Sequence, residues 1–130
     1  MNKKIVIEGN NIVDIPSFYR EINRVFMHGE NWEIGQSLDA FNDMLYGGFG
    51  IIQGSDTIRF IWKNFKKNKM DLGFETTKAF YIEKLQTPSR FNTDLIRKWL
   101  DALEKGMGKT FFEIVIDIIE SHGNIELIEE

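Results

Sequence analysis

No cysteine occurs in this chain, which excludes disulfide bridges, thiolate metal sites and cysteine nucleophiles together. Long apolar runs are missing too, and none approaches the ~20 residues that a membrane-spanning helix needs. The first apolar run, residues 5–7, ends at the acidic Glu8 and is too short for the core of a signal peptide. These absences predict a soluble, cytoplasmic protein.

Histidine is scarce, and the two present, His28 and His122, each precede a glycine at the predicted end of a helix. A favourable interaction with the helix dipole explains both positions, so we predict capping residues rather than catalytic bases. Hydrophobic side chains make up 42% and charged ones 28% of the 130 residues, as in globular proteins. A chain of this length is expected to fold as one domain, residues 1–130.

Positive charge is absent from residues 25–58, an interval that carries five acidic residues: Glu30, Glu33, Asp39, Asp43 and Asp56. Residues 59–90 carry eight basic and three acidic side chains, and residues 91–130 are again acidic. The net charge of −4 therefore hides a strong segregation. A net acidic chain argues against general nucleic-acid binding, and the segregation indicates a directional field that favours a positive partner.

Apolar periodicity predicts the order strand, helix, helix, strand, helices, strand. Strands are expected at 4–8, 56–62 and 124–128, and helices at 16–27, between Ser37 and Gly47, and at 75–85, 92–105 and 110–122. Residues 63–69 are expected to be a solvated basic connection. Strands joined by helical crossovers form a parallel sheet, so the fold class is α/β. Because Ile58 and Ile61 fall on opposite faces of the second strand, we expect cover on both sides of the sheet.

Asp39 and Asp43 lie four residues apart on the second helix, so their carboxylates project from one face. Two like charges at this spacing are mildly destabilising. Asp39 in the first turn would interact favourably with the helix dipole, whereas Asp43 has no such explanation. The residues alone leave a structural and a partner-binding role open for the pair.

Catalytic and metal-binding functions are less well supported. A metal site would need Glu30, Glu33 or His28 in addition to the aspartates, and one helix with a loop does not define a cage of converging oxygens. Acid–base catalysis by the pair would need a nucleophile nearby, and none is evident. The chain is therefore predicted not to be an enzyme.

Three other patterns have ordinary structural explanations. The glycine-rich residues 47–50 follow a helix and precede a strand, the reverse of the order in phosphate-binding loops, so they predict a turn. The aromatic and basic residues 62–69 are compatible with a nucleic-acid surface but equally with a solvated connection. Trp32 in the acidic loop could anchor an interface or pack on the second helix.

The early strand, the first helix and the loop with Gly35 that leads into Leu38-Asp39-Ala40-Phe41-Asn42-Asp43-Met44-Leu45 together resemble the barstar family of intracellular ribonuclease inhibitors. The last helix, Gly123 and the closing strand agree with that family in order and spacing. The resemblance covers about residues 3–62 and 110–128, and residues 63–108 would be an enlarged helical insertion. It implies a three-stranded parallel sheet flanked by helices.

The resemblance also implies how such a protein works. The second helix and its preceding loop would occlude the active site of a basic ribonuclease, barnase-like or another toxin, with carboxylates placed where RNA phosphates bind. Barnase and barstar are themselves the documented case of such steering and hot spots. The partner-binding residues carried over to this chain are Asp39, Asp43, Glu33, Trp32, Asn42 and Gly35. Neither a cofactor nor a metal is expected, the free protein is expected to be a monomer, and neither nucleic acid nor membrane is a direct partner.

Two departures from the family pattern concern the contact face. Asn42 stands where the motif has an aromatic residue, and Ile118 stands where the family has an acid on the last helix. Asp117, Glu113 or Glu120 would have to replace that acid. The alternative function is a general protein-interaction module on the same scaffold, with residues 63–108 as its binding surface.

Overall fold

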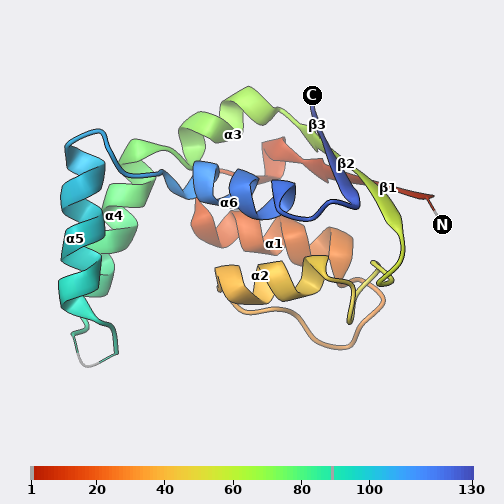
Figure 1. Cartoon of the computed structure of the whole chain (residues 1–130), viewed down its shortest axis with the longest axis horizontal. Helices are drawn as coiled ribbons and strands as arrows, with labels where there is room; N and C mark the ends of the chain where they lie inside the picture. The colour runs from red at the N-terminus through yellow and green to blue at the C-terminus, as the bar shows by residue number, and fades with distance from the viewer. Residues whose placement is uncertain (1, 89) are drawn as a thin grey trace.

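The computed structural model describes residues 2–88 and 90–130, which form a two-layer α/β fold (Figure 1). The strands in this part of the chain are β1 (Asn2–Glu8), β2 (Thr57–Lys63) and β3 (Ile125–Glu129). They make one all-parallel sheet in the order β1-β2-β3, with Ile5 beside Phe60 and Phe60 beside Leu127. The predicted three-stranded parallel sheet flanked by helices is confirmed.

The first crossover contains the short 3-10 helix η1 (Gly9–Asn11), α1 (Ile15–Phe26) and α2 (Leu38–Leu45). The second contains α3 (Phe65–Asp71), α4 (Phe74–Leu85), α5 (Thr93–Glu104) and α6 (Phe111–Glu120). Except for α3, the predicted helices are present within a few residues of their expected ends. None of the helices in the described ranges is long and apolar enough to cross a membrane.

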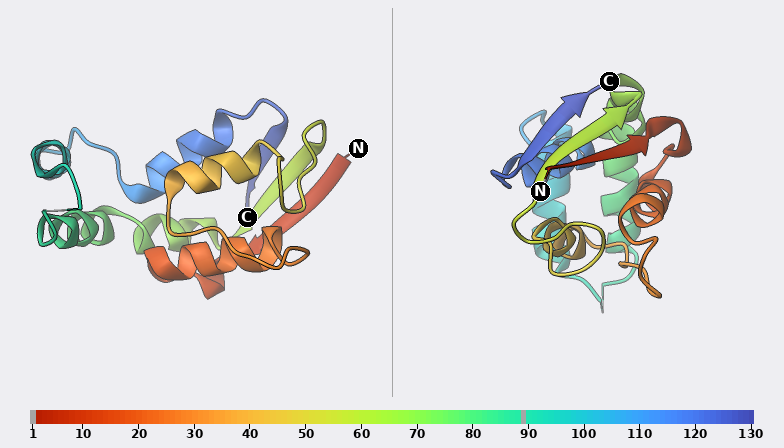
Figure 2. Two further views of the ribbon diagram at one scale, coloured as in Figure 1. Left: turned by 90° about the horizontal axis from the view of Figure 1, so that it is seen from below. Right: turned by 90° about the vertical axis from the view of Figure 1, so that its right-hand side faces the viewer.

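Helices α1, α2 and α6 cover one face of the sheet, and the opposite face is open (Figure 2). No helix of the described chain covers this face, and Thr57, Arg59 and Lys63 of β2 are exposed on it, although Ile61 of the same strand is buried. The expectation of cover on both sides is therefore wrong. The reason is topological, because both crossovers step in the same direction across the sheet and right-handed crossovers then place all their helices on one side.

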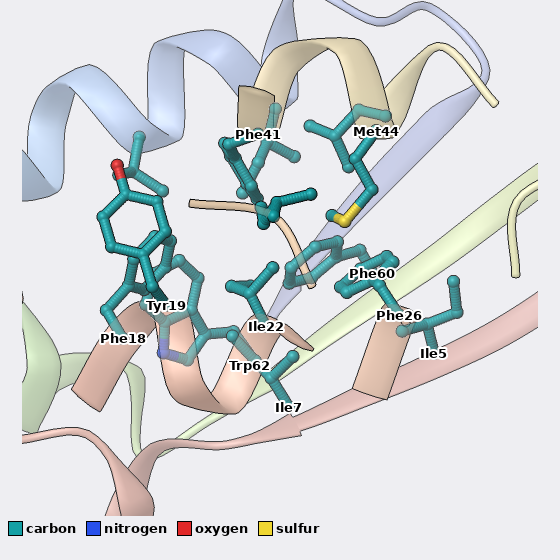
Figure 3. Close-up of a cluster of buried hydrophobic side chains, with 14 of the residues drawn as sticks. Ile5, Ile7, Phe18, Tyr19, Ile22, Phe26, Phe41, Met44, Phe60 and Trp62 are labelled. Atoms are coloured by element: carbon teal, nitrogen blue, oxygen red, sulfur yellow. The ribbon is translucent and has the colours of Figure 1, made fainter. Parts of the chain in front are cut away.

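The core lies between the inner face of the sheet and these helices (Figure 3). Asp14 caps α1 by accepting a hydrogen bond from the Ser17 backbone N–H, and Pro16 fits the first turn. The apolar stripe of α1 then meets that of α2 and the inward side chains of β2; the buried members include Phe18, Ile22, Phe26, Phe41, Met44, Phe60 and Trp62. This packing fixes which face of α2 remains at the surface.

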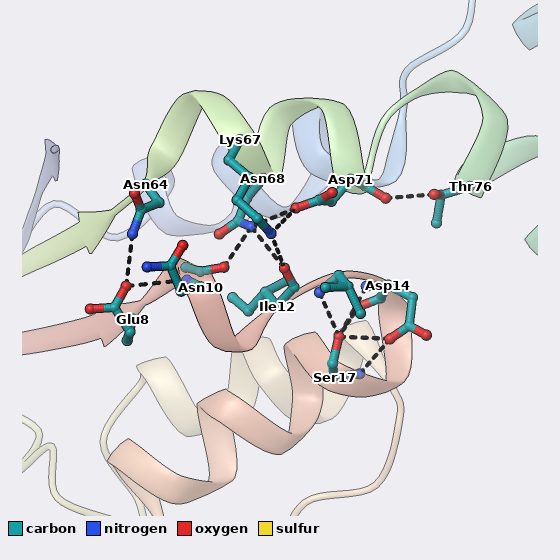
Figure 4. Close-up of polar contacts among 12 residues, drawn as sticks. Glu8, Asn10, Ile12, Asp14, Ser17, Asn64, Lys67, Asn68, Asp71 and Thr76 are labelled. Atoms are coloured by element: carbon teal, nitrogen blue, oxygen red, sulfur yellow. Dashed lines mark hydrogen bonds and ion pairs between the residues drawn. The ribbon is translucent and has the colours of Figure 1, made fainter.

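Residues 65–71 form helix α3, so the expected solvated connection is wrong (Figure 4). Its Asn68 is fully buried and links three segments of the chain. The Trp62 indole N–H donates to Asn68 Oδ1 at 2.7 Å, and Asn68 Nδ2 donates to the carbonyls of Gly9 and Ile12 at 3.0 and 3.2 Å. Gly9 is required here because a Cβ would lie 2.1 Å from the Lys63 carbonyl oxygen.

Helices α4 and α5 lie side by side at one end of the molecule (Figure 1), and we call this pair, residues 74–104, the arm. The arm has a small core of its own, built on Tyr81, Ile96 and Leu103. It is attached to α6 through Thr77, whose Oγ1 accepts a hydrogen bond from the Phe111 backbone N–H at 2.8 Å. We call the rest of the described chain the body.

Candidate acidic face and adjoining cleft

Helix α2 carries Asp39 and Asp43 on its solvent side, and both are exposed. Ser37 begins the helix by accepting a hydrogen bond from the Ala40 backbone N–H. Within the described residues, no ion pair forms at Asp39 or Asp43, although six acidic side chains elsewhere are paired with lysine or arginine. We call these two aspartates and their surroundings on α2 the acidic face.

Helix stability does not explain Asp43. It lies in the last turn of α2, where a carboxylate interacts unfavourably with the negative end of the helix dipole. It also stands one turn from the like charge of Asp39. Asp39, in the first turn, stabilises the helix because its carboxylate lies near the positive end of the dipole. Asp43 is therefore the better indicator of a positively charged partner.

Asp56, the last acid of the interval without positive charge, belongs to the scaffold. Its side chain is buried, accepts a hydrogen bond from the Gln53 backbone N–H at 2.9 Å and pairs with Lys3 at 3.0 Å. The hydrogen bond from Gln53, followed by that from Lys3, lowers the pKa of Asp56. This carboxylate closes the turn before β2 and does not extend the acidic face.

The loop before α2 is fixed at Ile34, which is buried and held on both backbone groups by Asn23 at 2.9 and 3.1 Å. Glu33 is exposed beside it. Gly35 accepts a hydrogen bond from the Ser37 N–H at 2.9 Å, and a Cβ at Gly35 would meet no atom within 4 Å. The loop is thus held in place, while Glu33 and Gly35 remain accessible.

Trp32 packs on the turn that follows the second helix. Its ring lies 4.9 Å from that of Phe49, in the turn after α2, and its indole N–H donates to Glu30 Oε2 at 3.2 Å. The side chain remains 45% exposed. Of the two roles considered for Trp32, this position is compatible with an interface anchor at the edge of the acidic face.

Asn42 lies on the flank of α2 and serves the scaffold. Its Oδ1 lies 2.7 Å from His122 Nε2, and the His122 ring is 4.5 Å from that of Tyr46. An amide oxygen only accepts, so this contact is a hydrogen bond in the tautomer that carries the proton on Nε2. His122 is buried, and burial lowers its pKa. The histidine predicted as a simple cap thus also joins the end of α6 to α2.

The candidate acids on the last helix are mostly engaged. Glu113 accepts a hydrogen bond from the Thr110 backbone N–H at 2.9 Å and so caps α6, and Asp117 pairs with Lys109. Glu120 is exposed, and Ile118 is half-buried against the core. Of the three expected replacements, Glu120 is the one without a structural role in the described contacts.

A cleft of about 660 Å³ separates the start of α2 from the arm. One wall belongs to the body and includes Tyr19, Ser37 and Asp39; the other belongs to the arm and includes Tyr81 and Trp99. Trp99 lies at the apolar spacing of α5 three residues after the buried Ile96, but it is itself 45% exposed. Sequence reasoning missed this cleft because its walls come from segments far apart in the chain.

The two lysines of the cleft are already engaged. The Lys109 ammonium pairs with Asp117. The Lys84 ammonium lies 4.4 Å from the centre of the Phe80 ring and 5.0 Å from that of Phe91, and burial lowers its pKa. Asp39 is therefore the acidic group in the cleft that is left open to a partner.

No family model and no curated protein matches this chain. No three histidine or acidic side chains converge on a possible metal position in residues 2–88 and 90–130.

Proposed function

We propose that this protein is an intracellular, non-enzymatic inhibitor that binds a basic ribonuclease and occludes its active site. Asp39 and Asp43 take the places of RNA phosphates against the lysine, arginine and histidine side chains of the enzyme. The carrying observation is the pair of exposed carboxylates on one face of α2, which form no ion pair within the described chain. The resemblance of residues 38–45 to the barstar motif supports the same function.

The surroundings of α2 suit this role because they hold the carboxylates in place. Phe41 and Met44 anchor the opposite side of the helix in the core, and Asn42 ties its flank to His122. A rigid inhibitor loses little conformational entropy when it binds. Glu33 and Trp32 then extend the contact along the loop.

The test begins with affinity capture from source-cell lysate, followed by a ribonuclease assay of the bound protein with and without an excess of the inhibitor. A basic ribonuclease should be captured and inhibited. Asp39→Asn and Asp43→Asn should each weaken inhibition by roughly thirtyfold or more, the usual loss when one member of a desolvated charge pair is removed. Glu126→Gln, an exposed acid on the open side of the sheet, is the matched control. If both aspartate variants inhibit as well as wild type, this site is wrong.

A second candidate function is a general interaction module that binds its partner through the arm. The observation in its favour is the set of partly exposed apolar side chains on α4 and α5: Phe74, Ile82, Leu95 and Trp99. For such a module, substitutions on the arm should abolish partner binding, and Asp39→Asn with Asp43→Asn should leave it intact. The same variants therefore distinguish the two functions.

A further inference from the structure

The cleft between the body and the arm continues the acidic face. The first turn of α2 faces the arm (Figure 1), so Asp39 lines the cleft and Asp43 lies one turn farther away. One turn of helix advances by about 5.4 Å. A protein seated over both aspartates therefore reaches the mouth of the cleft without leaving α2.

The arm offers this neighbour an aromatic wall. Trp99 on α5 and Tyr81 on α4 have ring centres 6.0 Å apart, and Trp99 is 45% exposed although it lines the cleft. Tyr19 lies on the opposite wall, with its hydroxyl directed away from the sheet (Figure 3). Exposed tryptophan beside a recess is the kind of residue that dominates the energy of protein interfaces.

The acidic group that lines the cleft is Asp39, which forms no ion pair with any described residue and is open to a cation. Lys109 and Lys84 line the cleft too; Lys109 pairs with Asp117, and the Lys84 ammonium lies over two phenylalanine rings. An arginine fits this combination, since its planar guanidinium stacks on aromatic faces and pairs with a carboxylate. The cleft volume of about 660 Å³ is ample for one such side chain with part of its loop.

We propose that the arm is a second contact surface for the same ribonuclease, and that an arginine-bearing loop of the enzyme enters the cleft and stacks on Trp99. This inference rests on the proposed inhibitory function and adds to it a contact outside the enzyme's active site. The arm and α2 then contact the same partner at two adjoining surfaces. Selection among basic ribonucleases falls to the arm, because phosphate mimicry alone suits any of them.

The experiment uses the full-length chain and the ribonuclease recovered in the capture assay as the probe. Trp99→Ala should weaken inhibition at least about tenfold, as expected for an interface hot spot. Lys98→Ala is the control, because Lys98 is the exposed neighbour of Trp99 on α5 and does not line the cleft. It should change inhibition by less than about twofold. Circular dichroism establishes that each variant is folded.

Two further measurements keep the proposal falsifiable if Trp99→Ala disturbs the arm. Hydrogen exchange in the wild-type complex should slow at amides 77–84 of the arm as well as at 38–45. A double-mutant cycle of Asp39→Asn with Trp99→Ala should show non-additive losses, because both residues contact one loop. Additive losses would overturn the single-loop form of the proposal.

The outcomes separate this inference from the proposed function. If the aspartate variants weaken inhibition while Trp99→Ala and arm exchange match wild type, the second contact is wrong and the inhibitory site stands. If Trp99→Ala abolishes binding and the aspartate variants do not, the arm alone binds the partner, and the proposal that the arm and α2 both contact it is wrong. Failure to capture or inhibit any ribonuclease overturns both.

Discussion

At the scale of single residues, Asp39 and Asp43 differ in what they do to the helix that carries them. Asp39 gains from the positive end of the α2 dipole and loses from repulsion by Asp43, and these effects have similar sizes. For Asp43, both the helix dipole and the repulsion by Asp39 are unfavourable. In the proposed inhibitor, binding and stability would therefore make opposite demands on Asp43, which forms no ion pair in the described chain.

Denaturation of two variants checks this difference. Asp43→Asn should raise the free energy of unfolding by about 0.3–1 kcal/mol, because it relieves both the dipole and the charge repulsion. Asp39→Asn should change it by less than about 0.5 kcal/mol, since its two effects offset each other. Urea titration at low ionic strength measures both. A clear loss of stability in Asp43→Asn would mean that Asp43 has a structural partner.

Asn68 shows what sequence reasoning could not find at this scale. Its neighbours in the chain are lysines, and a run of lysines with one asparagine predicts a solvated segment. The residue is buried because its amide satisfies the Trp62 indole and two carbonyls from the β1–α1 connection. Those partners lie up to 59 residues away, so no local pattern reveals them.

Replacing Asn68 by alanine should lower the free energy of unfolding by about 2–4 kcal/mol, because several buried polar groups lose their partner at once. Lys69→Ala, one residue later and exposed, should change it by no more than about 0.5 kcal/mol. Urea unfolding of both variants gives the comparison. Equal stability of the two would show that water replaces the amide.

At the scale of secondary-structure elements, helix positions were largely predictable because caps and apolar stripes are local. Asp14, Ser37 and Asn92 precede helices and accept a hydrogen bond from the first turn. The contacts between elements were not predictable. His122 lies past the end of α6, yet its ring bonds Asn42 on α2, 80 residues earlier. This bond positions the helix that carries the acidic face.

The buried His122 should make stability depend on pH. Its folded-state pKa lies below the ordinary value of 6.5, so both states are neutral above that pH and the contribution is constant. As pH falls below 6.5, the unfolded chain binds a proton that the folded chain takes up only at lower pH, and the free energy of unfolding decreases. We expect His122→Gln to lose less stability than wild type between pH 7.5 and 5.5 (about two units).

Urea unfolding of wild type and His122→Gln at both pH values measures this difference. His28→Gln, which replaces an exposed histidine, provides the control. Equal losses in the wild type and His122→Gln would contradict the assignment of the effect to the buried ring.

At the scale of the whole molecule, the strand order explains where a functional site can lie. The parallel sheet was predictable from alternating strands and helices, but the order β1-β2-β3 was not. A sheet whose crossovers all step one way has no switch point, the position at which open α/β sheets usually bind small ligands. A functional site is then expected on the helical layer or on the arm.

The same topology predicts that the arm is separable from the body. Leu72 precedes the arm and Phe112 follows it, and these two residues meet where the Phe112 backbone N–H donates to the Leu72 carbonyl at 3.0 Å. A short glycine–serine linker in place of residues 74–109 therefore spans a gap that the fold already closes. We expect the shortened chain to fold cooperatively around the main core, with β1, β2 and β3 intact.

Its free energy of unfolding should fall by about 2–5 kcal/mol, because the Thr77–Phe111 hydrogen bond and the packing of Phe80 on Phe111 are lost. Circular dichroism and urea unfolding measure this loss. If the arm is a second contact, the shortened chain should still inhibit the ribonuclease through Asp39 and Asp43, but at least about tenfold less tightly. A shortened chain without a cooperative transition would show instead that the arm and the body fold as one unit, since the arm's own small core would then be needed to complete the larger one.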